Sequence, residues 1–227
     1  MFQPLLAGEQ IFAVLGAASE ANPVEAWRTL VDGASPQPIW AGTAYATWDE
    51  VMPYIGVVES GSPFLDWVAC TESTDWGWLA ISSSPLETVV AHLQGLTKVY
   101  LPGGQAVFFR FWDGAQCLPI LQQSGAEILP VFQHYLVNGQ RLSVTPGPVT
   151  AAKASPWWQI PAPLLAHLAG QSAQTLIDNL LQWLEEQRPD LHAAFTPATL
   201  QHKVAYFARS PDVSHEALVD YLASELS

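Results

Sequence analysis

The first half of the chain alternates compact apolar runs with segments in which apolar residues recur at helical spacing. Residues 11–18 and 77–82 are apolar runs bounded by turn-forming residues, and each predicts a buried β-strand. Shorter strands are predicted over 39–41 and 53–55. Helices are predicted to begin where a capping residue precedes a proline, at Asn22-Pro23, Ser62-Pro63 and Ser84-Pro85.

The most aromatic run lies within residues 98–113. Residues 107–112 are all apolar or aromatic except Arg110, and such a continuous run predicts a central strand buried on both faces. Pro102-Gly103-Gly104 predicts the turn before it. A guanidinium buried in such a strand has to be paired, and Asp113 is the nearest acid. Two interpretations stay open: an internal ion pair that fixes the strand end, or a docking arginine for a partner.

The second half changes character after a proline-rich segment. Asn138-Gly139 predicts the turn of a β-hairpin. Beyond the prolines, apolar residues recur at helical spacing to the end of the chain. We therefore predict an α/β (α+β) fold. Its mixed β-sheet lobe, flanked by helices, covers residues 1–148, a linker covers 149–160, and an all-helical C-terminal lobe covers 161–227.

Residues 108–113, with the sequence FFRFWD, resemble a family signature. They are similar to the fRFYDP motif of the effector-adaptor chaperones (Tap/TEC-type) of bacterial type VI secretion, which share a domain of unknown function. The match holds at Arg110, Phe111 and Asp113. Trp112 stands where the family usually has Tyr, and Gly114 stands where it usually has Pro.

The surrounding segments follow the same family's order. Residues 12–18 resemble its opening yaLlDaa strand, with Gly16 in place of the usual Asp. Residues 53–55 resemble a strand of the family, and residues 84–96 resemble one of its helices, with His92-Leu93 in register. The resemblance covers residues 10–140 and implies a cytoplasmic adaptor. Such a protein binds one type VI effector and helps to load it onto the VgrG spike protein, without catalysis or a cofactor.

Two other functions stay open from the sequence: a small hydrolase with an unrecognised active site, and a structural subunit of an assembly. The chain has no Gly-x-Ser-x-Gly elbow, no P-loop and no His-Glu-x-x-His motif, and its six histidines are dispersed. Cys70 and Cys117 are expected to be buried small residues. We therefore expect no catalytic residue and no metal site. We also expect neither a signal peptide nor a membrane span.

The charge of the chain narrows its partners. The formal net charge of −13 makes nucleic-acid binding improbable, because phosphate contacts need clustered Lys and Arg. Residues 29–97 contain eight acids, Asp49 and Glu50 among them, and no Lys or Arg. This acidic stretch is either a solvated surface or a surface that steers a basic partner.

Ten tryptophans in 227 residues indicate a large aromatic core, and tryptophan is also a favoured anchor at protein interfaces. Trp157 and Trp158 lie in the proline-rich segment. Their rings are expected either to wedge between the two lobes or to act as exposed anchors for a partner.

Overall fold

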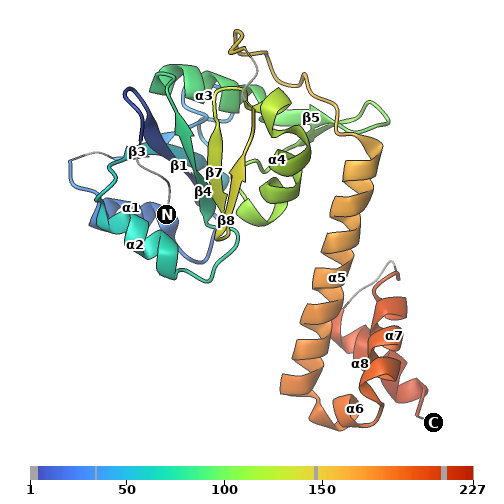
Figure 1. Ribbon diagram of the computed structural model, residues 1–227. Helices are drawn as coiled ribbons and strands as arrows, with labels where there is room; N and C mark the ends of the chain where they lie inside the picture. Colours follow the sequence, from blue (N-terminus) through green and yellow to red (C-terminus); the bar gives the residue numbers. More distant parts are fainter. Residues whose placement is uncertain (1–4, 34, 146–147, 211–213, 227) are drawn as a thin grey trace. The chain divides into compact units, whose positions relative to one another are not determined.

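Six short segments from the first half of the chain and the hairpin after it assemble into one sheet in the computed structural model. The structure describes residues 5–33, 35–145, 148–210 and 214–226, without the side chains of 171–175 and 179. It divides the chain into two compact units, Met1–Leu164 and Leu165–Ser227. Figure 1 shows the elements of both units.

The six-stranded sheet of the first unit has the order β2-β3-β1-β4-β7-β8, and every pairing in it is antiparallel. Its strands are β1 (Gln10–Gly16), β2 (Gln37–Pro38), β3 (Pro53–Val58), β4 (Gly77–Ser82), β7 (His134–Val137) and β8 (Gln140–Ser143). A separate two-stranded sheet pairs β5 (Lys98–Tyr100) with β6 (Ala106–Phe108). Together with the helices, these sheets confirm the predicted α+β class.

Successive side chains of a strand point to opposite faces of the sheet, and in the central strands β1 and β4 the side chains on both faces are apolar. Both faces of the sheet therefore have to be covered. On one face, Ile11, Ala13 and Leu15 of β1 pack in a cluster with Trp27 and Phe64. Those two aromatic residues belong to α1 (Pro23–Leu30) and α2 (Pro63–Cys70), which lie side by side in Figure 1. The other helices of this unit are α3 (Leu86–Gly95), α4 (Gly114–Ile128) and the 3₁₀ helix η1 (Asp49–Val51).

The strands that are buried on both faces are β1 and β4, so the prediction of a central strand over 107–112 was wrong. All six residues of β4 are buried, whereas β6 ends at Phe108. The residues that follow β6 form no regular structure and are held by single hydrogen bonds. The N–H of Phe109 donates to the carbonyl of Thr97 (3.0 Å), and Trp78 Nε1 donates to the carbonyl of Phe111 (2.7 Å). Aromatic side chains therefore enter the core here from a loop.

Local turn and cap signals had mixed outcomes. The hairpin turn at Asn138-Gly139 is confirmed, with φ of 49° and 72° at its two residues. Ser62 caps α2 by accepting the N–H of Phe64, whereas Asn22 and Ser84 make no side-chain cap. The strand predicted over 39–41 was wrong because the chain turns at Trp40, where the N–H of Thr43 donates to the carbonyl of Trp40 (3.0 Å). Cys117 is buried as predicted, but Cys70 is exposed at the end of α2.

The proline-rich segment is bound along the first unit. The carbonyl of Trp158 accepts the N–H of Tyr100, and the N–H of Ile160 donates to the carbonyl of Tyr100, both at 2.8 Å. Trp158 is buried, and its Nε1 donates to Glu127 (3.3 Å). Trp157 is half-buried, with the Lys153 ammonium 4.1 Å from its ring centroid. Trp158 therefore contributes to the first unit and offers no exposed surface to a partner.

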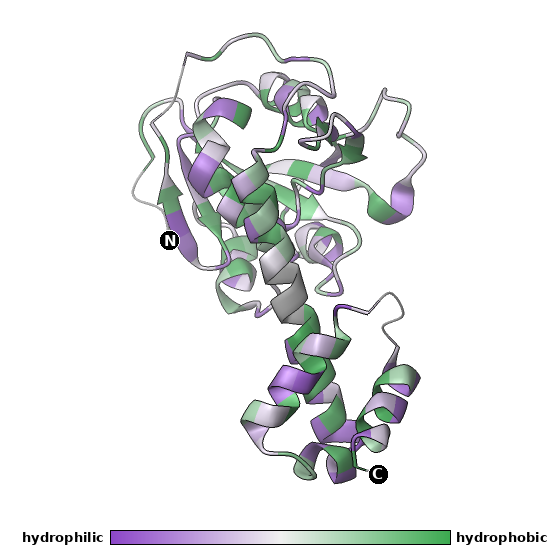
Figure 2. Cartoon of the chain, turned by 90° about the vertical axis from the view of Figure 1, so that its right-hand side faces the viewer, coloured by the Kyte–Doolittle hydropathy of each residue, from purple (hydrophilic) through white to green (hydrophobic). Residues whose placement is uncertain are grey.

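The second unit is helical, as predicted, and α5 crosses the division between the units. Its helices are α5 (Ala162–Gln187), α6 (Pro189–Ala193), α7 (Pro197–Phe207) and α8 (His215–Ser224). Each carries hydrophobic and hydrophilic residues, as Figure 2 shows, and the apolar ones share one core that includes Leu184, Val204 and Leu218. No helix in the described part of the chain is long and apolar enough to cross a membrane.

Candidate functional site

The first four residues of the FFRFWD segment alternate between surface and core, and the last two, Trp112 and Asp113, are both buried. Phe109 and Phe111 are buried, whereas 39% of Phe108 and 48% of the Arg110 side chain are exposed. The segment was predicted to bury Arg110, and this prediction was wrong because the guanidinium lies at the surface. The ion pair that was expected for Arg110 is present, with Nη2 3.3 Å from Asp113 Oδ2.

Asp113 connects this segment to α4. Its Oδ1 accepts the N–H groups of Ala115 and Gln116 at 3.0 and 3.4 Å, which caps the helix. Burial raises the pKa of the Asp113 carboxyl, although Arg110 and the two cap hydrogen bonds act in the opposite direction. The net rise means that desolvation costs the ionised carboxylate more than its partners return. Asp113 therefore acts mainly as a hydrogen-bond acceptor for the helix.

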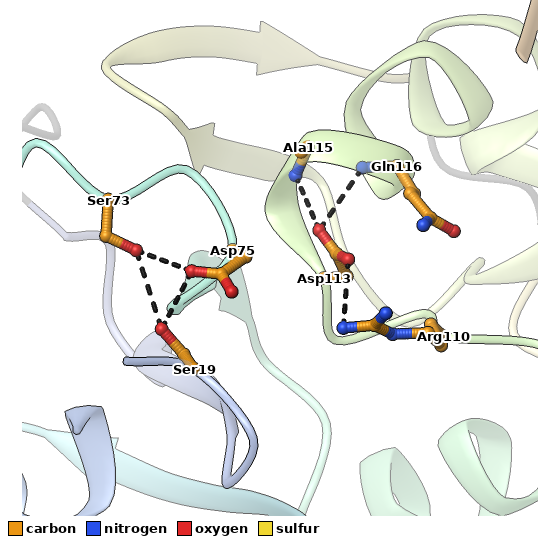
Figure 3. A network of polar contacts seen from close by, with 7 residues as sticks. All are labelled: Ser19, Ser73, Asp75, Arg110, Asp113, Ala115 and Gln116. Carbon is orange, nitrogen blue, oxygen red and sulfur yellow. Dashed lines mark hydrogen bonds and ion pairs between the residues drawn. The ribbon is translucent and has the colours of Figure 1, made fainter. Parts of the chain in front are cut away.

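A second carboxylate, Asp75, lies near this pair (Figure 3). Its Oδ1 accepts hydrogen bonds from the hydroxyls of Ser73 (2.6 Å) and Ser19 (2.8 Å), which tie the loop after β1 to the loop before β4. Burial acts to raise the pKa of Asp75, but the two serine hydrogen bonds and the Arg110 charge outweigh it and lower that pKa. Arg110 is thus a single surface cation shared between two acids.

Five aromatic rings meet beside Arg110: Trp40, Tyr45, Trp48, Phe108 and Trp112. The ring centroids of Trp48 and Phe108 are 5.1 Å apart, and those of Trp40 and Trp112 are 5.3 Å apart and nearly perpendicular. Tyr45 contacts both members of the first pair, with its ring centroid 5.2 Å from that of Trp48 and 5.1 Å from that of Phe108. We call these five residues the aromatic cluster.

Consecutive turns over residues 40–51 present one side of the aromatic cluster. The N–H of Trp48 donates to the carbonyl of Tyr45 (3.1 Å), and the N–H of Val51 donates to that of Trp48 (3.2 Å). On the other side, β5 holds β6 in register and so positions Phe108 opposite Lys98. The Lys98 ammonium lies 4.8 Å from the Phe108 ring centroid and 5.5 Å from that of Tyr45. Two segments far apart in sequence thus form one surface.

This surface contains a hollow of about 320 Å³, which we call the aromatic hollow. It is lined by Ala18, Trp40, Trp48, Val51, Phe108, Arg110 and Trp112. Trp48 is 43% exposed, and Val51 and Phe108 are each 39% exposed. Three large apolar side chains left in water around one concave site are typical of a surface that a partner covers.

Trp40 adds a polar group to the wall of this hollow. Its ring is buried, and its Nε1 is a buried donor with no acceptor among the described residues. A buried donor without a partner costs about 1–3 kcal/mol, so such groups are uncommon in folded proteins.

The structure brings some of the predicted site residues together and separates others. Arg110 and Trp112 line the aromatic hollow. Asp49 and Glu50 do not line it, but they lie in sequence between two lining residues, Trp48 and Val51. Phe111 and Asp113 do not line the hollow: the Phe111 ring is buried in the core, and Asp113 caps α4. Trp157 and Trp158 do not line the hollow.

Sequence reasoning missed Trp40, Trp48 and Val51 as members of the site. The available signal was three large apolar residues in a stretch, 40–51, that has no sustained helical or strand periodicity beyond the short strand predicted over 39–41. In such a stretch, apolar residues have no periodic face to bury, and several remain at the surface.

A second hollow, of about 420 Å³, lies beside the loop that precedes β4 and the Asn138-Gly139 turn. Its lining includes Glu72, Ser73 and Arg141. Within the described ranges, no three His, Cys, Asp or Glu side chains are close enough to hold a metal ion. His92, in α3, is largely buried, and its Nε2 lies 3.1 Å from the carbonyl oxygen of Thr150.

Two of the three departures from the family motifs noted in the sequence, Gly16 and Trp112, lie against each other. A Cβ atom placed on Gly16 would be 2.8 Å from Trp112 Cδ1, closer than real Cβ contacts. The Trp112 ring therefore occupies the space that a side chain at position 16 would need. A tryptophan in place of the usual Tyr is compatible with this strand because the usual Asp is replaced by glycine.

This contact predicts a coupled pair of substitutions. Gly16→Ala is expected to destabilise the chain by about 1–3 kcal/mol through overpacking. In a Trp112→Ala background, which has no ring atom in that space, the same change is expected to cost less, with a coupling energy of about 0.5–3 kcal/mol. Urea unfolding of the two single variants and the double variant measures this coupling. Strictly additive effects would contradict the steric account.

Comparison with protein families gives one match. A family model described as "Domain of unknown function (DUF4123)" matches residues 11–129, which run from β1 to the end of α4. This range includes every residue that lines the aromatic hollow. Comparison with the curated proteins and with the solved structures gave no match.

Proposed function

The chain belongs to the DUF4123 family, and from that premise we propose that it is a cytoplasmic adaptor chaperone of the Tap/TEC type. The family is associated with adaptors for type VI secretion effectors. In this proposal the chain binds one effector, promotes its loading onto the VgrG spike protein and catalyses no reaction.

The observation that carries this proposal is the aromatic hollow beside the FFRFWD segment. The site offers exposed tryptophan and phenylalanine rings on a surface fixed by β5, β6 and the turns over 40–51. Rings of this kind dominate binding energy at protein interfaces, because they bury a large area and lose little conformational entropy. A binding role needs nothing more from these residues than their shape and position.

Covering the hollow also explains how an adaptor would assist its effector. Trp48, Val51 and Phe108 are exposed to water in the free protein. In this proposal the effector carries a complementary apolar surface that is exposed before loading. Contact removes both surfaces from water, which favours the complex by roughly 25 cal/mol per Å² of apolar area before the costs of association. The bound effector surface is then unavailable for aggregation.

Affinity purification tests this function. The tagged chain is purified from the bacterium that encodes it, and co-purifying proteins are identified by mass spectrometry. We expect an effector and a VgrG protein encoded near the adaptor gene, and a higher soluble yield of that effector when the two are co-expressed. Recovery of neither protein, with no change in effector solubility, would contradict the proposal.

A further inference from the structure

We propose that the aromatic hollow receives one large apolar side chain from a partner segment in which a Lys or Arg neighbours that side chain. The inference rests on the proposed adaptor function and specifies the chemistry that the partner presents. The basic residue would lie over Asp49 and Glu50 of η1, which are flanked in sequence by the lining residues Trp48 and Val51.

The apolar part of the partner follows from the walls of the hollow. Apart from Arg110, every lining side chain is apolar or aromatic. The volume of about 320 Å³ is near the lower end of the range of about 300–1,000 Å³ for ligand sites in proteins. It suits a single bulky side chain inserted from a neighbouring surface better than an extended ligand.

The basic part follows from the charges around the hollow. Asp49 and Glu50 are exposed, and in the described part of the chain neither forms an ion pair. Arg110 is already paired with Asp113 and acts on Asp75, and Lys98 lies over the Phe108 and Tyr45 rings. Arg110 is therefore engaged by two acids, and Lys98 by two aromatic rings. The carboxylates of Asp49 and Glu50 remain available to a cation of the partner.

Trp40 supplies a second, independent observation. Its Nε1 is a buried donor that lacks an acceptor within the described residues, in a ring that lines the hollow. A backbone carbonyl of an inserted segment is the kind of group that would satisfy this donor after a small adjustment of the ring.

The same charges disfavour a second copy of this chain as the occupant. The chain carries a net charge of −13, with only eight Lys and Arg against 21 Asp and Glu, so two copies repel each other. Electrostatic complementarity selects a basic segment of another protein and accelerates its encounter with this surface.

Fluorescence anisotropy with synthetic peptides tests the inference. The probe is a labelled peptide with one Phe between two Lys residues, in a Gly/Ser context. One matched peptide replaces the Phe by Ala, and a second replaces both Lys by Glu. We expect measurable binding of the probe and an affinity at least about tenfold lower for either matched peptide.

Variants of the protein locate the binding. Val51→Ser and Phe108→Ala are expected to weaken the probe by about tenfold or more, whereas Leu6→Ser, at an exposed leucine outside the hollow, leaves it unchanged. Asp49→Asn with Glu50→Gln should slow association, and less so at high salt. Glu59→Gln with Asp66→Asn, which removes the same charge from exposed positions elsewhere in the first unit, should slow it less.

The outcomes separate this inference from the adaptor function. Equal binding of all three peptides, or equal effects of the two acid pairs, would overturn the proposed partner chemistry. If the Val51 and Phe108 variants still co-purify the effector as the unchanged chain does, the adaptor function stands and the hollow is not its docking site. If the unchanged chain captures no effector, the function fails whatever the peptides show.

Discussion

Phe111→Ala is expected to lower the free energy of unfolding by about 3–5 kcal/mol, whereas Phe108→Ala is expected to lower it by only about 1 kcal/mol. The two residues are three positions apart in the same aromatic run, but the Phe111 side chain is completely buried and Phe108 is 39% exposed. Removing the Phe111 ring leaves a cavity against Phe109 and Trp112. Removing the Phe108 ring leaves a space that water can fill.

Urea unfolding followed by tryptophan fluorescence measures both free energies. Partner binding distinguishes the two substitutions in another way. Phe108→Ala should weaken partner binding while the protein remains folded. The account of this segment would be contradicted if Phe108→Ala destabilised the chain as much as Phe111→Ala does.

Asp113→Ala is expected to cost about 2 kcal/mol, most of it from the lost cap of α4, while Asp113→Asn costs less than half of that. The asparagine retains an oxygen that can accept the N–H groups of Ala115 and Gln116. It loses only the charge, and the raised pKa of Asp113 shows that this charge is a net cost in its buried position. The ion pair adds little, because Arg110 is half exposed.

The raised pKa also gives the sign of a pH effect. The folded chain holds the Asp113 proton more tightly than the unfolded chain does. Ionisation of this carboxyl therefore reduces the stability of the fold as the pH rises above 3.8, the ordinary pKa of an aspartate. Asp113→Asn does not titrate. The difference in stability between the unchanged chain and this variant should therefore narrow from acid to neutral pH.

Asp75, whose pKa is lowered, contributes the opposite trend, so the two proteins are compared in an Asp75→Asn background, in which position 75 does not titrate. Unfolding free energies of the two proteins across this pH range provide the test. A difference that widens toward neutral pH would show that the Arg110 pair, and not the helix cap, is what Asp113 supplies.

Local signals predicted much of the fold correctly. The strand over Gly77–Ser82 was predicted with the bounds that the structure has, because turn residues flank a short, fully buried run. The Asn138-Gly139 turn was found from two residues whose conformations suit a hairpin. A cap followed by proline predicted the start of α2, where the Ser62 side chain accepts the N–H of Phe64.

Tertiary contacts decided what could not be predicted. Residues 107–112 have the composition of a buried strand, but the hydrogen bonds to Thr97 and Trp78 that shape this loop come from distant segments. The exposure of Arg110 depends on the position of Asp113 at the start of α4, which a linear pattern of apolar residues does not contain. The aromatic hollow forms only when the turns over 40–51 meet β6.

Hydrogen exchange, measured by mass spectrometry on the chain alone and on its complex with the co-purified effector, tests the central claim most directly. That claim is that this DUF4123 protein binds its effector through the aromatic hollow. The account predicts slower exchange in the complex for backbone amides of residues 40–51 and 106–110, which carry most of the lining side chains. Slower exchange confined to the second unit, with unchanged exchange in both of these segments, would contradict it.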